Sequence, residues 1–110
     1  MPAETLAADI GRAWRYQREG KPDAAITEYE RVLQQDSKSV DGNYGMGLAR
    51  RDAGKKDQAI QSFQAALAVV EASIAAHNET VDAPHTAEGD RNLMLARMIR
   101  QRLSELGAPK

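Results

Sequence analysis

The sequence predicts an all-α fold, an α-solenoid of two helix-turn-helix repeats followed by a C-terminal capping helix. The first observation is an internal repeat, because residues 54–67 reproduce the arrangement of residues 20–33 at an offset of 34 residues. The second is that apolar residues recur at helical spacing between breaks that contain Gly or Pro. A chain of 110 residues is expected to form one domain with one modest core. The offset aligns Asp23 with Asp57, Ala25 with Ala59, Ile26 with Ile60, Tyr29 with Phe63, Val32 with Ala66 and Leu33 with Leu67.

The composition is that of an ordinary soluble protein, with 42% hydrophobic residues, 28% charged residues and a net charge of −1. The near-neutral charge gives no general attraction to nucleic acid or to an anionic membrane. The absence of cysteine excludes disulfides and thiolate zinc sites. The start, residues 1–5, lacks the features of a signal peptide, and no run reaches the roughly 18 apolar residues of a membrane span. We therefore expect a cytoplasmic protein without a membrane partner.

The first repeat, about residues 6–39, is expected to contain helices at 3–19 and 22–35. Gly20 ends the first helix, and Pro22 stands in the first turn of the second, where its missing N–H costs nothing. One face of the first helix carries Leu6, Ile10, Ala13, Trp14 and Gln17, and four of these five residues can form a buried apolar stripe.

The second repeat, about residues 40–77, is expected to contain helices at 40–53 and 57–77. Ser39 is the predicted N-cap of the helix at 40–53. A linker at about 78–89 and a capping helix at about 90–106 complete the chain, and a capping helix is expected to have a polar outer face.

In both repeats a Gly ends the first helix, and the second helix carries Ala and then Tyr or Phe. This pattern resembles the tetratricopeptide repeat (TPR), a helix pair with a period of about 34 residues. The resemblance covers about residues 6–71 and is strong in both second helices. In the first helices, Asp9, Arg12 and Arg50 replace bulky or aromatic residues of the family pattern. The resemblance implies a scaffold that binds a peptide or a helix of a partner protein in a concave groove. The chaperone-binding carboxylate clamp is not implied, because Ile10, Trp14 and Gly45 stand where that clamp has Lys or Asn.

The helix at 40–53 contains three glycines, each of which costs up to about 1 kcal/mol in a helix interior. Gly47 matches a small position of the TPR pattern, where two helices approach closely. Gly42 and Gly45 have no such reason in the sequence and are interpreted as tolerated weak helix, with a hinge or a close ligand as alternatives. The residues predicted to be buried are Ala25, Tyr29, Leu33, Ala59, Phe63 and Leu67.

No motif predicts an enzyme or a cofactor. His77 and His85 are the only histidines, and with Glu79, Asp82 and Glu88 nearby they leave a metal site or an enzyme as a remote alternative. The last helix has four arginines, Arg91, Arg97, Arg100 and Arg102. Without an aromatic residue among them they are read as a solvated face or a contact to an acidic partner rather than a nucleic-acid site.

The groove implied by the resemblance is lined by the first helix of each repeat and by the capping helix. The expected ligand is a protein segment with hydrophobic anchors beside acidic residues. On this view Tyr44→Ala and Arg51→Glu weaken binding and leave the melting temperature nearly unchanged. The implied site residues are Ala7, Ile10, Trp14, Gln17, Arg18, Asp41, Tyr44, Leu48, Arg51, Asp52, Leu93, Arg97 and Arg100.

Three alternatives stay open from the sequence. Trp14 belongs either to the groove or to the buried face of its helix. In the second alternative, the fourth helix, the linker or the basic cap folds back and fills the groove. In the third alternative the module self-associates into a homo-oligomer through its repeat ends, because two and a half repeats lie near the threshold of about three for stability.

Overall fold

The computed structural model describes residues 3–78 and 87–108, and it contains five helices within these ranges. They are α1 (Ala3–Arg18), α2 (Pro22–Gln35), α3 (Val40–Asp52), α4 (Lys56–Asn78) and α5 (Ala87–Glu105). No strand occurs in the described ranges, so the predicted all-α class is confirmed.

The first four helices begin and end within one residue of the predicted bounds, but α5 begins at Ala87 rather than at residue 90. Ala at position 87 and Glu at position 88 favour a helical first turn, and this turn forms although position 89 is a glycine. Positions 78 and 87–89 of the predicted linker at 78–89 belong to α4 and α5, and residues 79–86 lie outside the described residues.

The two helix ends that the repeat aligns are built in the same way. Gly20 and Gly54 have φ angles of 75° and 79°, a left-handed conformation that glycine adopts without a Cβ penalty. At both ends the residue after the glycine donates its N–H to the carbonyl five residues earlier, at 2.8 Å. Ser39 caps α3 as predicted, because its Oγ accepts from the Gly42 N–H at 2.9 Å.

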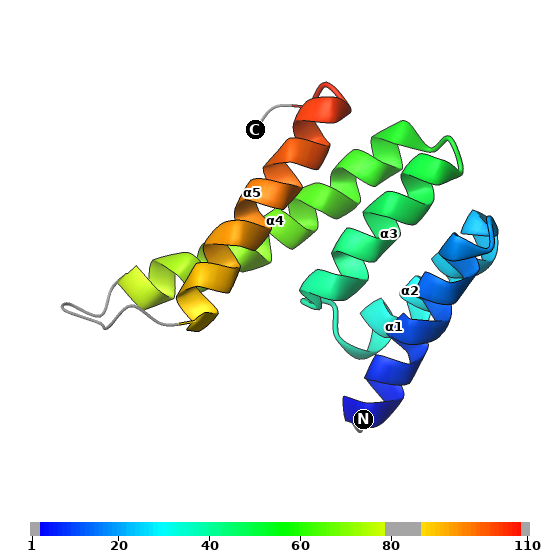
Figure 1. The fold of residues 1–110 in the computed structure, drawn as a ribbon, viewed down its shortest axis with the longest axis horizontal. Coiled ribbons are helices and arrows are strands. Elements are labelled where there is room, and N and C mark those ends of the chain that lie inside the picture. The colour runs from blue at the N-terminus through cyan, green and yellow to red at the C-terminus, as the bar shows by residue number, and fades with distance from the viewer. Residues whose placement is uncertain (1–2, 79–86, 109–110) are drawn as a thin grey trace.

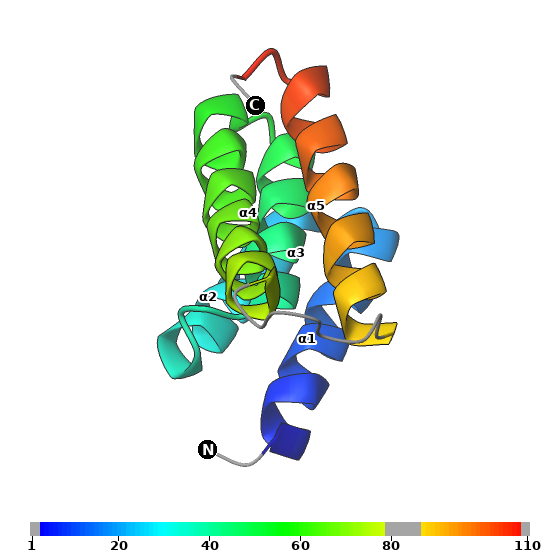
Figure 2. The ribbon, with the colours of Figure 1, turned by 90° about the vertical axis from the view of Figure 1, so that its left-hand side faces the viewer.

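Each helix packs against the next one along the chain, and α1 also contacts α3. In Figure 1, α3 lies between the α1–α2 pair and the α4–α5 pair, and the molecule is flat, with extents of 46 × 37 × 20 Å. In the view of Figure 2, α4 and α5 lie side by side in front, which agrees with their contact. Neighbours in sequence are therefore neighbours in space.

The core consists of two clusters that are centred on the two aligned aromatic residues. Tyr29 is fully buried among residues of α1, α2 and α3, and Phe63 is fully buried among residues of α4 and α5. Five of the six residues predicted to be buried are buried, and Leu33 is the exception. It is only half-buried, because it stands near the end of α2, beside the turn that leads into α3.

The glycines of α3 are explained by close helix packing. A Cβ at Gly47 would lie 2.6 Å from the Phe63 ring, which agrees with the small residue expected there. A Cβ at Gly45 would lie 2.3 Å from the Tyr29 ring, and one at Gly42 would lie 2.9 Å from Val32. The interpretation of Gly42 and Gly45 as tolerated weak helix is therefore wrong, because both permit side chains of α2 to approach the α3 backbone.

Polar contacts account for the positions at which the first helices depart from the TPR pattern. Arg12 lies between two buried carboxylates, 3.3 Å from Asp9 and 3.1 Å from Glu28, and so joins α1 to α2. In the second hairpin the Arg50 guanidinium donates to the Ser62 hydroxyl at 2.8 Å and joins α3 to α4. The Arg12–Glu28 and Arg50–Ser62 pairs thus supply hydrogen bonds between the two helices of each hairpin.

Contrary to the expectation that no run reaches the length of a membrane span, the stretch Lys56–Ala76 of α4 is long and apolar enough to cross a membrane by length and composition. One third of its most apolar window is buried inside the structure, and core helices of soluble proteins share these properties. The stretch therefore assigns no location to the chain.

Candidate functional site

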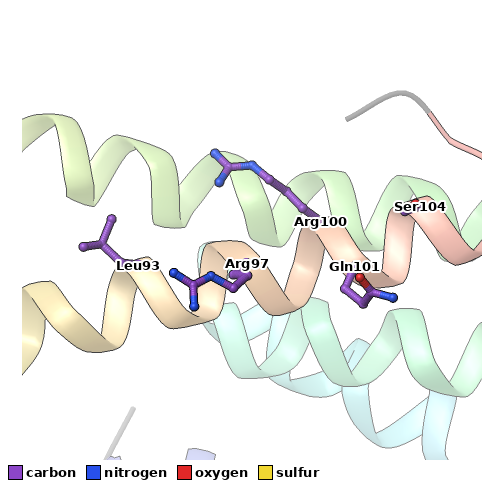
Figure 3. A pocket seen from close by; sticks show the side chains of 5 residues that line it. All are labelled: Leu93, Arg97, Arg100, Gln101 and Ser104. Atoms are coloured by element: carbon purple, nitrogen blue, oxygen red, sulfur yellow. The ribbon is translucent and has the colours of Figure 1, made fainter.

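A surface pocket of about 370 Å³ lies along α5. Its lining residues are Leu93, Arg97, Arg100, Gln101 and Ser104 (Figure 3). The structure therefore brings together the three α5 residues that the sequence placed in the groove. Figure 3 shows the Arg100 side chain extending across α4, while the Arg97 side chain turns along α5 toward Leu93.

The two pocket arginines differ in their electrostatic partners. Arg100 donates to the Glu71 carboxylate on α4 at 3.2 Å. Arg97 has no ion pair within the described part of the chain and is exposed. Arg97 is therefore the guanidinium of this pocket that is available to a carboxylate from another molecule.

The α1 residues of the predicted groove are divided between surface and core. Trp14 is 37% exposed and meets the Tyr29 ring edge-on, with ring centroids 6.4 Å apart and an interplanar angle of 88°. Arg18 is exposed, Ile10 is half-buried, and the Gln17 side-chain oxygen accepts a hydrogen bond from the Tyr29 hydroxyl. Trp14 is thus an exposed aromatic side chain that packs edge-on against a buried core residue.

The α3 residues of the predicted groove are mostly structural. Tyr44 and Leu48 are half-buried and pack against the core of α4 and α5, with the Tyr44 ring centroid 5.5 Å from that of Phe63. Arg51 is exposed and pairs with the adjacent Asp52 at 3.3 Å. The expectation that Tyr44→Ala leaves the melting temperature unchanged is therefore replaced by an expected loss of stability.

The buried Tyr29 hydroxyl is held in its neutral form. Burial raises the pKa of Tyr29 well above its ordinary value, and the negative charge of Asp41 raises this pKa further. Tyr29 consequently remains a hydrogen-bond donor to Gln17 at physiological pH. This contact joins the core of α2 to the end of α1 beside Trp14.

The basic helix α5 does not cover Trp14. It packs against α4, and Figure 1 shows α3 lying between α5 and α1. The alternative in which the linker fills the groove concerns residues 79–86, which lie outside the described residues. Of the other implied positions, Asp41 and Asp52 are exposed, and the side chain of Ala7 lies outside the described residues.

The histidine alternative receives no geometric support. His77 lies in α4 one residue before its end, and its side chain lies outside the described residues, as does the whole of His85. Within the described residues, no group of three or more His, Cys, Asp or Glu side chains could hold a metal ion.

Sequence reasoning missed two exposed methionines on α5. Met94 is 53% exposed and Met98 is 39% exposed, which contradicts the polar outer face expected of a capping helix. The spacing of the buried residues Ala96, Ile99 and Leu103 already places these methionines off the buried stripe. That spacing is the sequence signal that could have found them.

Compared with models of known protein families and with curated protein sequences, the chain has no match. Membership of the TPR family therefore stays a prediction from the repeat pattern.

Proposed function

We propose that this chain is a protein–protein interaction module of the TPR type, without enzymatic activity. It binds a peptide or a helix of a partner protein along the surface to which α1, α3 and α5 contribute. The observation that carries the proposal is an exposed aromatic side chain, Trp14, on a rigid support. A large aromatic side chain with a fixed orientation loses little entropy on binding, and such residues dominate the energetics of protein interfaces.

The support for Trp14 comes from three helices. The Trp14 ring packs edge-on with Tyr29 of α2, and Tyr29 is packed against the backbone of α3 at Gly45. Gln17 holds the Tyr29 hydroxyl from α1 itself. A ligand that covers Trp14 therefore meets a surface that needs little rearrangement.

Charges beside this surface favour a ligand that contains acidic residues. Arg18 ends α1 and Arg51 lies in the last turn of α3, and both are exposed. Exposed charges of this kind steer and orient a ligand more than they add affinity. The proposed ligand is a segment with one or two apolar anchors and neighbouring Asp or Glu.

The test uses the single tryptophan of the chain as a probe. Random linear peptides displayed on phage are selected on the immobilised protein, and the selected peptides are titrated while Trp14 emission is recorded. The proposal expects a change in emission wavelength or intensity on binding and weaker binding of the same peptides by Arg51→Glu. Lys55→Glu is the matched control, since it makes the same charge change at an exposed residue of the α3–α4 turn. If selected peptides leave Trp14 emission unchanged and bind Arg51→Glu as tightly as wild type, this surface is not the site.

A further inference from the structure

The side of α5 that faces away from α4 is unusually apolar for an exposed helix surface. α5 packs on α4 through Ala96, Ile99 and Leu103. Three of the four large hydrophobic side chains that are exposed in the described residues lie on α5, and Leu93, at 52% exposure, is among them. We call five of the exposed residues of this helix the α5 outer face: Leu93, Met94, Arg97, Met98 and Gln101. The exposed Arg91 adjoins this face, three residues before Met94.

The charge on this helix has one sign over most of its length. Residues 91–104 contain four arginines and no carboxylate. Two of these arginines have partners, because Arg100 pairs with Glu71 and Arg102 pairs with Glu105 at 3.4 Å. Arg91 and Arg97 have no ion pair within the described residues. The apolar strip is therefore accompanied by two arginines that no carboxylate of the described residues pairs with.

We propose that the α5 outer face docks an acidic amphipathic helix of a partner protein. The inference rests on the proposed function in taking the chain as a protein-binding module. It shares Leu93 and Arg97 with the predicted groove, adds Met94 and Met98, and names the chemistry of the partner. An incoming helix would bury its apolar stripe on Leu93, Met94 and Met98, and its Asp or Glu side chains would pair with Arg91 and Arg97. Methionine suits such a contact, because its flexible, polarisable side chain adapts to the shape of the partner.

A second copy of this chain fits the surface less well than an acidic helix does. Two α5 outer faces placed against each other would bring Arg91 and Arg97 of both copies into one interface. The carboxylates of this helix, at positions 88, 90 and 105, stand at its two ends rather than among the arginines of residues 91–104. Juxtaposed like charges oppose association, so charge selects a partner of opposite sign.

The experiment selects partners for the face without assuming their sequence. A displayed library of single helices with a randomised outward face is selected on the intact protein, and the enriched helices are synthesised with a fluorescent label. Their affinities are measured for wild type, Arg97→Glu, Met98→Ser and Arg15→Glu. Arg15→Glu is the matched control, because Arg15 is an exposed residue of α1. Circular dichroism confirms that each variant keeps its helix content, and sedimentation measures the oligomeric state of the wild type and of Met98→Ser.

The proposal expects enriched helices with an apolar stripe flanked by Asp or Glu. It expects affinity to fall at least about tenfold for Arg97→Glu and for Met98→Ser, to stay unchanged for Arg15→Glu and to weaken with added salt. Trp14 emission should not change, because α3 lies between α5 and α1. This readout separates failure here from failure of the Trp14 surface. Enriched helices without acidic residues, or equal affinity for all four proteins, would overturn the proposal. A wild-type dimer that Met98→Ser dissociates would also overturn it in favour of a second copy.

Discussion

The ring of Tyr29 occupies the position that a side chain at Gly45 would need. A Cβ built on Gly45 lies 2.3 Å from Cζ of Tyr29, far inside the separation that two carbon atoms tolerate. Tyr29 is fully buried at this contact, so the ring cannot move outward without opening the core of α1, α2 and α3. Glycine at position 45 thus costs helix propensity, but its missing Cβ allows α2 to pack closely on α3.

Gly45→Ala should therefore destabilise the protein although alanine is the better helix former. We expect a loss of about 1 to 3 kcal/mol, because overpacking outweighs the gain of up to about 1 kcal/mol in helix propensity. Gly11→Ala is the control, since Gly11 lies within α1 and a Cβ there meets no atom within 4 Å. That change should stabilise the protein by about 0.5 to 1 kcal/mol. Urea denaturation of both variants measures the two effects, and a Gly45→Ala protein as stable as Gly11→Ala would contradict the packing.

The buried Tyr29 hydroxyl predicts how stability depends on alkaline pH. The pKa of Tyr29 is raised in the folded protein above its unfolded value near 10. The folded state therefore holds this proton more tightly, so the stabilisation is fully present below about pH 10 and is lost as the pH rises above that value. The melting temperature of the wild type should fall more steeply above pH 10 than that of Tyr29→Phe. If the melting temperatures of the two proteins fall in parallel between pH 9 and pH 11, the pKa of Tyr29 is not raised by folding.

Phe63 holds the second cluster as Tyr29 holds the first. It is fully buried, and its ring lies against the backbone of α3 at Gly47. Phe63→Ala should cost about 3 to 5 kcal/mol, close to the whole stability of a domain of this size. The neighbouring exposed residue provides the control, because Gln64→Ala should change stability by less than about 0.5 kcal/mol. A cooperative urea transition of Phe63→Ala with an unchanged midpoint would mean that the repeat register is wrong.

The repeat offset was a strong guide to the fold because it identifies equivalent buried residues without any knowledge of their partners. Tyr29 and Phe63 are both fully buried, and the glycines that precede the second helices end the first helices in the same geometry. The first four helices could be placed within one residue, since caps and breakers are local signals. The start of α5 was wrong by three residues because a glycine in a first turn is a weak breaker.

The candidate site could be predicted only in part, because exposure depends on the neighbouring helix. Leu93, Arg97 and Arg100 do share one pocket. Tyr44, placed on the same surface by its repeat position, is half-buried against α4 and α5 instead. Gly45 could not be explained from sequence either, because the ring that excludes a larger residue comes from another helix, 16 residues earlier in the chain. Periodicity assigns a residue to a helix face but does not say which atoms cover that face.

The partly buried Tyr44 provides a test that separates stability from binding on α3. Its ring packs edge-on against Phe63 at 5.5 Å, so Tyr44→Ala should lose about 1.5 to 3 kcal/mol and lower the melting temperature. Arg51→Glu changes an exposed side chain whose one ion pair within the described residues is to the adjacent Asp52, so its effect on stability should stay within about 0.5 kcal/mol.

Thermal melting followed by circular dichroism compares these two variants with the wild type. Binding of the selected peptides should then be measured well below the midpoint of Tyr44→Ala, where its folded fraction is close to one. Under these conditions Arg51→Glu should lose affinity through charge alone, and Tyr44→Ala should lose affinity only to the extent that the ligand touches the ring. A Tyr44→Ala protein that melts like the wild type would mean that Tyr44 is a free surface residue. The assignment of α3 to the core of α4 and α5 would then be wrong.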